Sequence, residues 1–364
     1  MNVVIAFPSA FANTHGLAKA IKRAIPALTS VIIEDSCLVC ESTDAVEHAS
    51  RMTKLFGIDR VAIAKKVSSR FSDLCAEIAK VGTKIVMPGH SFYIRTIIQQ
   101  SARHDYVSRD VEFAASGMLT ARLAAIKAHP AKSEKDAQDF ILVVVGQKWA
   151  YVCIQMSNAP GGIVAGSQGS VLASIHGPLS LLSCLNAAKG GFELVIILPY
   201  FDEEDLKRNT ALAQVFVTKT GTRKQKILAT PINVREKGTI ALFLREMIIS
   251  EILNSHSNYN RIVLPLNIAV HPLWMIDLVI REAVSAKKTP FAPLLFMSEE
   301  LISYAQVVGI QEQEILSETI QAKEDLFRKY NRIIESEAKV AIKRTKRLDL
   351  EVGPNYLHDV IDSI

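Results

Sequence analysis

The segment Asn158–Phe201 constrains the fold of this chain most strongly. Val171–Ile175 is a short apolar run, Leu179–Ala188 has the spacing of a helix that Gly190-Gly191 would end, and Leu194–Leu198 is a fully apolar strand candidate. A strand, a helix and a second strand in this order form a βαβ unit. We therefore expect a parallel sheet.

The turn after the first of these strands is the expected ligand position. In parallel α/β sheets, ligands bind at the carboxyl ends of strands, where backbone N–H groups and a helix N-terminus can face an anion. A phosphate-binding turn usually holds several Gly and Ser residues. This turn is His176-Gly177-Pro178, with one Gly and a Pro that has no N–H to donate. The location of this turn suits phosphate binding, but its residue composition does not suit it as well.

Residues 161–181 read GGIVAGSQGSVLASIHGPLSL. This pattern resembles the linker and nucleotide loop of tRNA 4-thiouridine synthetases, GG-x-P-x-G-[ST]-Q-x-x-V-L-x-L-[IL]-S-G-G-x-D-S. In that family a THUMP domain precedes a PP-loop ATP-pyrophosphatase domain, and the proteins also deliver sulfur for thiamine. The resemblance implies the same module order over nearly the whole chain.

The chain keeps the linker signature of this family and loses the catalytic one. The first Ser of the motif falls on His176, its second Gly on Pro178, its Asp on Ser180 and its last Ser on Leu181, so that Gly177 alone is kept. A PP-loop stabilises the leaving pyrophosphate with N–H and hydroxyl donors. These losses should therefore weaken adenylation severely. We expect a degenerate nucleotide loop comprising Ser174, His176, Gly177 and Ser180.

A second nucleotide-contacting segment of the family is also altered. Leu264–Val270 stands in the place of T-G-E-x-x-G-Q, with Pro265, Leu266 and Val270 replacing Gly, Glu and Gln. We interpret the nearby His271 and Trp274 as packing residues rather than a replacement catalytic pair. No catalytic residue is assigned, and the chain has no cysteine after Cys184, where some relatives carry a catalytic one.

The THUMP resemblance rests on residues 92–117. It comprises Phe92-Tyr93-Ile94-Arg95, the turn Ala102–Tyr106, and Ser108-x-Asp110-x-Glu112 with Gly117. THUMP domains of this family bind the acceptor end of tRNA. Between residues 60 and 127 the chain has eleven Lys or Arg against five acids, which is typical of a polyanion-binding face but also occurs on ordinary solvated surfaces.

The candidate RNA-binding residues are Arg95, Arg103, His104 and Arg109. They lie close together around one strand end and one helix start, where guanidinium groups and helix N–H groups can meet phosphates. The alternative is that Arg95 pairs with a core carboxylate and that His104 is a cap.

These patterns predict a multidomain chain of the α/β and α+β classes. We expect a ferredoxin-like N-terminal domain at residues 1–59, a THUMP RNA-binding domain at 60–157, a doubly wound PP-loop domain of the adenine nucleotide α-hydrolase type at 158–316, and a basic helical tail at 317–364. Thr14 and Asp44 are candidate N-caps of the first two helices. The basic tail residues fit a solvated helix end as well as RNA contact.

Cysteine usage and apolar runs indicate the compartment. The five cysteines are an odd number in mostly apolar surroundings, and no run approaches the roughly 18 residues of a membrane span. We expect a cytoplasmic protein without a membrane segment. Cys37 and Cys40 have a spacing that zinc and redox sites use, but no second pair completes a zinc set, so we interpret them as structural and expect no metal.

Three functions remain open from the sequence. The first is a tRNA-binding protein, a pseudoenzyme whose PP-loop domain persists as a scaffold, docking surface or subunit. The second is a divergent ATP-dependent tRNA sulfurtransferase, in which Ser174, His176 or Ser180 substitutes for the missing groups. The third is an altered pocket for another small molecule. ATP and Mg²⁺ are expected only for an active PP-loop. The candidate partners are tRNA, a sulfur-donor or catalytic protein, and a second copy in a homodimer.

Overall fold

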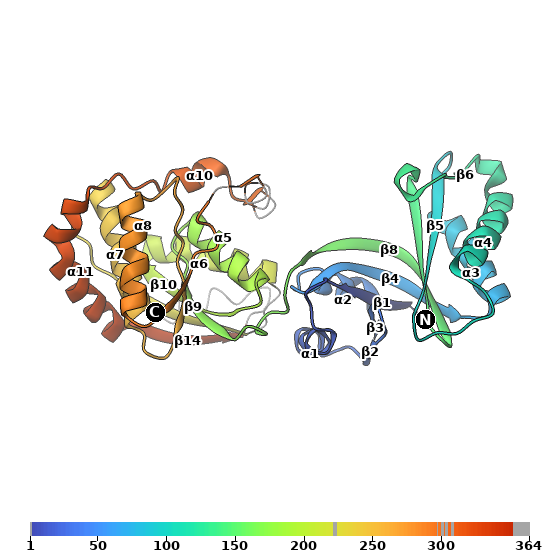
Figure 1. Cartoon of the computed structure of the whole chain (residues 1–364), viewed down its shortest axis with the longest axis horizontal. Coiled ribbons are helices and arrows are strands. Elements are labelled where there is room, and N and C mark those ends of the chain that lie inside the picture. Colours follow the sequence, from blue (N-terminus) through green and yellow to red (C-terminus); the bar gives the residue numbers. More distant parts are fainter. Residues whose placement is uncertain are drawn as a thin grey trace. The chain divides into compact units, whose positions relative to one another are not determined.

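The computed structural model describes residues 2–220, 224–296, 298–299, 302, 305–306 and 309–351. The chain forms two compact units, Met1–Gly162 and Ile163–Ile364. Each unit is built around one sheet, so that the expected mixed α/β architecture is confirmed (Figure 1).

The first unit contains an eight-stranded sheet of order β2-β3-β1-β4-β8-β7-β5-β6. Its strands are β1 (Asn2–Pro8), β2 (Ser30–Ile33), β3 (Leu38–Glu41), β4 (Ile58–Ser68), β5 (Ser91–Ile98), β6 (His129–Pro130), β7 (Asp139–Val145) and β8 (Trp149–Gly161). The long strands β4 and β8 pair antiparallel, with Ala62 opposite Met156. They join the segments predicted as residues 1–59 and 60–157 into one sheet.

The first four strands confirm the ferredoxin-like prediction. Strands β2-β3-β1-β4 are antiparallel neighbours, with α1 (Thr14–Ala24) between β1 and β2 and α2 (Ala45–Met52) between β3 and β4. Asp44 caps α2, as predicted, by accepting the Glu47 N–H at 3.0 Å. The Thr14 prediction is wrong by one residue, because Asn13 accepts the N–H groups of the first turn of α1.

Helices α3 (Phe71–Ile85) and α4 (Ser108–Leu123) cover the other half of this sheet. The sequence predicts a helix at Ser69–Val81 and a strand at Lys84–Met87. The strand is wrong, because α3 continues to Ile85. The bare backbone of Gly82 lets Leu119 of α4 approach closely, which supports this extra turn of helix. Helix α4 is shorter than the helix Ser108–Ala128 that the sequence predicts, and the 3₁₀ turns η1 (Ala124–Ile126) and η2 (Glu134–Asp136) follow it.

The second unit contains a six-stranded sheet of order β13-β12-β9-β10-β11-β14. Its strands are β9 (Ser170–Ser174), β10 (Glu193–Tyr200), β11 (Lys224–Pro231), β12 (Arg261–Val263), β13 (Thr289–Phe291) and β14 (Lys346–Glu351). The first five pair in parallel, and β14 is antiparallel to β11. The βαβ prediction for residues 171–198 is therefore confirmed.

Helices α5 (Pro178–Lys189), α6 (Glu203–Thr220), α7 (Thr239–Ser255), α8 (Leu273–Ser285), α10 (Glu312–Leu316) and α11 (Glu324–Arg344) complete this unit. Val195 and Ile197 of β10 share a core with α7, α8 and α11. Ile196 and Leu198 are also buried and point to the opposite face, where α5 and α6 pack together. Helices on both faces make the sheet doubly wound, as predicted.

The segment predicted as a helical tail is only partly helical. Helix α11 ends at Arg344, and the chain then extends into β14, where its backbone hydrogen bonds pair with the edge of β11. Residues 352–364 of the predicted tail lie outside the described residues. The sequence also predicts a helix at Phe296–Val308, and much of that segment lies outside the described residues as well. Among the residues described, no helix combines the length and apolar character needed to cross a membrane.

Candidate functional site

The turn after β9 lies where the strand order of the parallel sheet reverses. Strand β9 has β10 on one side and β12 on the other, and the chain winds outward in both directions from this point. Such a switch point leaves a crevice outside the carboxyl ends of the strands, where ligands of open α/β sheets bind. The structure thus places Ser174, His176, Gly177 and Ser180 together at this end of β9 and the start of α5.

Ser180 closes this turn onto itself. Its Oγ accepts the N–H groups of His176 and Gly177 at 2.9 and 3.0 Å, and donates to the Gly177 carbonyl at 2.8 Å. Two N–H groups that could face an anion therefore have an internal partner. A Ser at the position where the family carries Asp acts here as a structural cap of α5.

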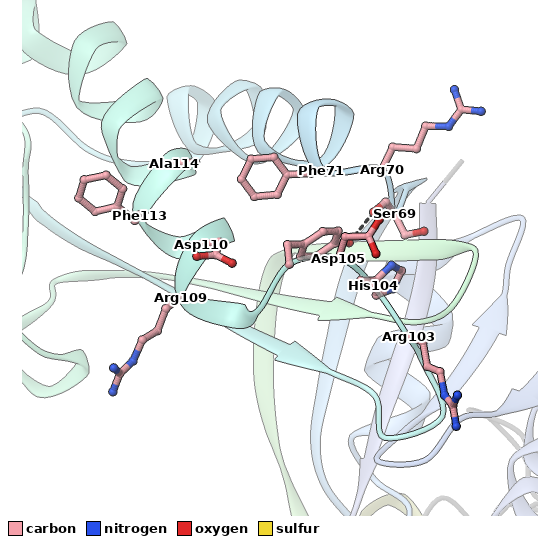
Figure 2. A pocket seen from close by; sticks show the side chains of 11 residues that line it. Ser69, Arg70, Phe71, Arg103, His104, Asp105, Arg109, Asp110, Phe113 and Ala114 are labelled. Carbon is pink, nitrogen blue, oxygen red and sulfur yellow. Dashed lines mark hydrogen bonds between the residues drawn. The ribbon is translucent and has the colours of Figure 1, made fainter.

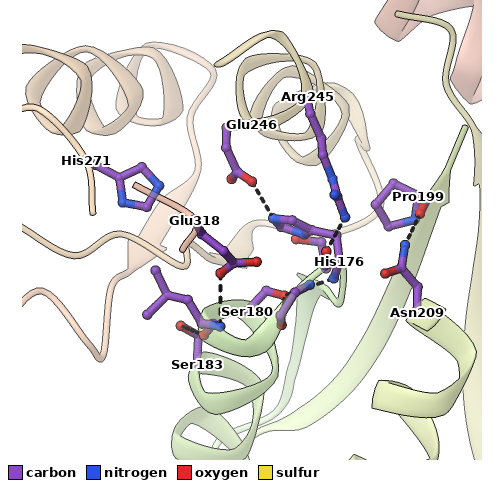
Figure 3. Close-up of polar contacts among 12 residues, drawn as sticks. His176, Ser180, Ser183, Pro199, Asn209, Arg245, Glu246, His271 and Glu318 are labelled. Carbon is purple, nitrogen blue, oxygen red and sulfur yellow. Dashed lines mark hydrogen bonds and ion pairs between the residues drawn. The ribbon is translucent and has the colours of Figure 1, made fainter. Parts of the chain in front are cut away.

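Glu318 covers the same turn from outside. Its Oε2 accepts the Leu179 N–H at 3.3 Å, and a Cβ added to Gly177 would lie only 1.6 Å from its Oε1 (Figure 3). Burial, reinforced by the negative charge of Glu246, raises the pKa of Glu318 to about 8. The carboxyl group of Glu318 therefore lies over the N-terminus of α5. Sequence reasoning missed Glu318, because no motif links it to a turn about 140 positions earlier.

Two charged residues of α7, Glu246 and Arg245, hold His176 in place. Its Nε2 lies 2.8 Å from Glu246 Oε1, and the two side chains are 4% and 20% exposed. Burial alone would raise the pKa of Glu246, but the neighbouring His176, His271 and Arg245 outweigh it and hold this pKa at about 2. Arg245 donates to the His176 carbonyl oxygen, so that both residues of α7 fix the turn (Figure 3).

His271 is buried, as its interpretation as a packing residue implies. The Asn267 N–H donates to His271 Nδ1 at 3.2 Å, and burial lowers the pKa of His271. Leu181 and Val270 are buried as well, so that apolar side chains surround the polar turn.

Several buried polar atoms beneath the turn have no hydrogen-bond partner within the described part of the chain. They are Ser174 Oγ, His176 Nδ1, Asn209 Oδ1, Thr210 Oγ1 and Arg245 Nε. Buried polar groups are rarely left unpaired, and ordered water usually supplies the missing partner. These atoms form a polar cluster whose hydrogen-bonding capacity the described part of the chain does not use.

A second candidate site lies in the first unit. A pocket of about 960 Å³ is lined by Ser69, Arg70, Phe71, Arg103, His104, Asp105, Tyr106, Arg109, Asp110, Phe113 and Ala114. Three segments form it, at the start of α3, in the loop before α4 and at the start of α4. Figure 2 shows the guanidinium groups of Arg70, Arg103 and Arg109 extending outward from the ribbon. Three of the four predicted RNA-binding residues thus line one pocket.

Local contacts fix the wall of this pocket. His104 stacks on Tyr106, with 4.8 Å between ring centroids, and its Nε2 lies 3.0 Å from the Gly146 carbonyl oxygen. The Tyr106 hydroxyl donates to the Ser69 carbonyl oxygen. Phe113 is 85% exposed, and sequence reasoning missed it together with Arg70 and Phe71. Aromatic residues next to arginines in a basic segment were the sequence signal that could have identified them.

Arg95 does not line this pocket. It lies on β5, and its Nη1 forms a 3.2 Å ion pair with Glu134 Oε2, with both side chains about half exposed. The pairing alternative foreseen from the sequence thus describes Arg95 in this structure, although with a surface carboxylate. A role of Arg95 in RNA binding stays a prediction.

The cysteines are all free and buried. Burial raises the pKa of both Cys37 and Cys40 to about 12, which makes them poor nucleophiles and poor metal ligands at neutral pH. Within the described ranges, no cluster of three or more His, Cys, Asp or Glu side chains has the geometry of a metal site.

The chain thus combines a ferredoxin-like sheet, extended by α3, α4 and their strands, with a doubly wound parallel sheet. This is the order of modules that the resemblance to THUMP-containing PP-loop proteins predicts. The comparisons agree. A crystal structure of a 4-thiouridine synthetase–RNA complex with bound ATP superposes with a TM-score of 0.73 at 13% identity, covering 96% of this chain and 100% of that one. PH1313 from Pyrococcus horikoshii Ot3 gives 0.66 at 15% identity, covering 85% and 100%.

The sequence likeness is shorter. A probable tRNA sulfurtransferase of Methanosarcina mazei is 27% identical over 139 residues, which is 38% of this chain and 34% of that protein. The match thus spans about a third of the length of this curated relative, and no family model matches. The resemblance to the THUMP-containing 4-thiouridine synthetases is confirmed, and the identities to the solved structures establish a shared fold.

Proposed function

We propose that this protein binds tRNA through the pocket between α3 and α4, within the tRNA-modification class that its relatives represent. The observation that carries the proposal is that Arg103, His104 and Arg109 line one pocket of about 960 Å³. Guanidinium groups can bind phosphates there, and the exposed ring of Phe113 offers a stacking face to an unpaired base. The solved relative of the same fold that contains RNA supports tRNA as the ligand class.

We further propose that the PP-loop-like turn does not activate ATP. Its N–H groups already have acceptors in Ser180 and Glu318, and the Glu318 carboxyl lies where a phosphate would have to enter. A carboxyl group at that place repels a polyphosphate when it is ionised and obstructs one when it is neutral. The residues present therefore do not fit ATP and Mg²⁺, and we derive no chemical step through them.

Substitution in the pocket tests the RNA-binding proposal. Replacement of both Arg103 and Arg109 by Ala should weaken the affinity for bulk tRNA about 10- to 100-fold, because each guanidinium contact is worth roughly 1 kcal/mol or more. The control is Arg122→Ala, which removes an exposed arginine of α4 outside the pocket and should change the affinity less than twofold. Fluorescence anisotropy with labelled tRNA measures both. Equal losses in the two variants would contradict a site at the pocket.

The alternative is an active ATP-dependent tRNA sulfurtransferase. The polar cluster behind the turn, with its unpaired atoms, is the observation that favours it. Isothermal titration with ATP and Mg²⁺, first without and then with tRNA, separates the two functions. Binding in the micromolar range would support the alternative and call for a thiolation assay. No heat of binding, together with intact tRNA affinity, is expected for the pseudoenzyme, which would then act in the cytoplasm beside a separate catalytic or sulfur-donor protein.

A further inference from the structure

A short segment of the second unit is fastened across the turn after β9. This strap consists of residues 312–322, which include α10. Ile315 and Ile320 are buried, the Ile320 N–H donates to the Val270 carbonyl oxygen at 2.8 Å, and Trp274 Nε1 donates to the Ala322 carbonyl oxygen at 3.0 Å. Glu318 lies between these anchors and reaches the start of α5. The strap therefore closes the turn through one acidic side chain held between apolar and backbone contacts.

We propose that Glu318 makes this strap a proton-sensitive stopper, which closes the turn when its carboxyl group is protonated and is released more readily once that group is ionised. The fit against Gly177 is so close that no β-carbon has room there, and the Leu179 N–H is the donor that the carboxyl group covers. The stopper is a property of the second unit alone and does not depend on RNA binding. Its failure and the failure of the tRNA proposal are therefore distinguishable.

The charges around Glu318 explain the sensitivity to protons. Glu246 and Arg245 face it from α7, Arg208 faces it from α6, and the Leu179 N–H faces it from α5. His271 lies beside the Val270 anchor and interacts mainly with Glu246. Burial and the repulsion by Glu246 outweigh the two arginines, so that the closed state keeps the proton to about pH 8.

Linkage fixes the direction of the effect. In the open state Glu318 is solvated and titrates near its ordinary pKa of 4.5. Between about pH 5 and pH 8, opening therefore releases one proton, and the opening constant should rise by up to about tenfold per pH unit. Above pH 8 both states are ionised and the constant should level off. At the open turn, the N-terminus of α5 and the unpaired Arg245 Nε would then be accessible to solvent.

Amide hydrogen exchange of the strap in the full chain tests the proposal. Opening constants of residues 312–322, corrected for intrinsic exchange, are measured from pH 5.5 to 9. The opening constant of the wild type should rise with pH up to about pH 8 and then level off. Glu318→Gln should remove the rise, because Gln has no proton to release. Glu314→Gln, on α10 of the same strap, is the matched control and should behave as the wild type. The proposal would be overturned if the opening constant of the wild type did not change with pH, or if that of Glu318→Gln still rose with pH.

A second variant, Gly177→Ala, tests the proposal by changing the turn instead of the strap. Gly177 has an extended φ of −179°, which any residue can adopt, so that Gly177→Ala changes only the space that Glu318 occupies. Its methyl group should displace the carboxyl group and raise the opening constant at pH 6 at least tenfold. The fluorescence of Trp274, read in a Trp149→Phe background because these are the two tryptophans of the chain, should shift toward that of an exposed indole. An unchanged constant in Gly177→Ala would also contradict the stopper.

Discussion

At the scale of single residues, the pair His176 and Glu246 defines the polar interior of the second unit. The His176 side chain is almost fully buried, and Glu246 is its only ion-pair partner among the described residues. Buried pairs contribute little in net terms, but the removal of one partner leaves the other without compensation. The pair is therefore sensitive to single substitutions even if it adds little stability as a unit.

Glu246→Gln should lower the free energy of unfolding by about 3 kcal/mol at pH 7, because it removes the buried carboxylate that pairs with His176, whereas Arg245 keeps Asp205 at 4.0 Å. Asp277→Asn is the matched control. It breaks the exposed Asp277–Arg281 pair of 2.7 Å and should cost about 0.5 kcal/mol or less. Urea denaturation followed by circular dichroism measures both, and similar costs would contradict the buried role of Glu246.

The two acids of the site give stability opposite pH dependences. Glu246 has a lowered pKa, so that its contribution is present above about pH 4.5 and is lost as the pH falls toward 2. Glu318 has a raised pKa, so that its contribution falls as the pH rises from 4.5 to 8. Relative to wild type, Glu318→Gln should therefore gain stability between pH 5 and pH 8, by at most about 1.4 kcal/mol per pH unit. Denaturation at pH 5, 6.5 and 8 measures this gain, and a constant difference would contradict it.

At the scale of elements, the packing of α3 on α4 shapes the basic pocket, because both helix starts contribute to its wall. Gly82 of α3 packs directly against Leu119 of α4, and a β-carbon there would lie 2.6 Å from Leu119 Cδ2. Gly117 on α4 has no heavy atom within 4 Å of such a β-carbon. Substitution of Gly82 therefore reports on helix packing, and substitution of Gly117 reports on helix propensity alone.

Gly82→Ala should destabilise the protein by about 1–3 kcal/mol, because it forces Leu119 and its neighbours apart. Gly117→Ala should stabilise it by about 0.5–1 kcal/mol, because Ala loses less backbone entropy than Gly in a helix. Thermal unfolding of the two variants measures both changes. Two shifts of the same sign would show that α3 and α4 do not pack as closely as described.

At the scale of the whole molecule, the net charge of +5 is modest, but residues 60–127 alone carry a net +6. The polyanion-binding potential is therefore concentrated in the first unit. Three of its arginines, Arg70, Arg103 and Arg109, line the pocket, whereas Arg95 is paired with Glu134.

This distribution predicts the salt dependence of tRNA binding. In the Arg103→Ala, Arg109→Ala double variant, the slope of log affinity against log salt should become shallower by about 1.5–2. The variant loses two phosphate contacts, so that its binding releases fewer counterions. Arg95→Ala should change the slope less, since its charge is already partly neutralised. Anisotropy titrations at 50 to 300 mM KCl measure the slopes. A larger change for Arg95→Ala would place the RNA elsewhere on the first unit.

Local signals carried most of the fold prediction. Alternating apolar runs and helical spacing located the βαβ unit, and Asp44 marked a helix start correctly. Features that depend on contacts between distant parts of the chain could not be predicted from such local patterns. Helix α3 passes its predicted end because Gly82 packs on Leu119, Glu318 reaches a turn on another segment, and β14 exists only because β11 has a free edge. The pocket residues Arg70 and Phe113 come together through helix packing that sequence spacing does not reveal.

Strand β14 also bears on how the chain acquires its structure. The hydroxyl groups of Thr230 and Thr345 meet at 3.1 Å, although they are 115 positions apart. During synthesis, β11 emerges from the ribosome long before its partner, and its outer edge must wait unpaired while α7, α8 and α11 are made. An unpaired edge can template association with another chain. Nascent chains stalled before residue 346 should therefore depend on chaperones more than finished ones do.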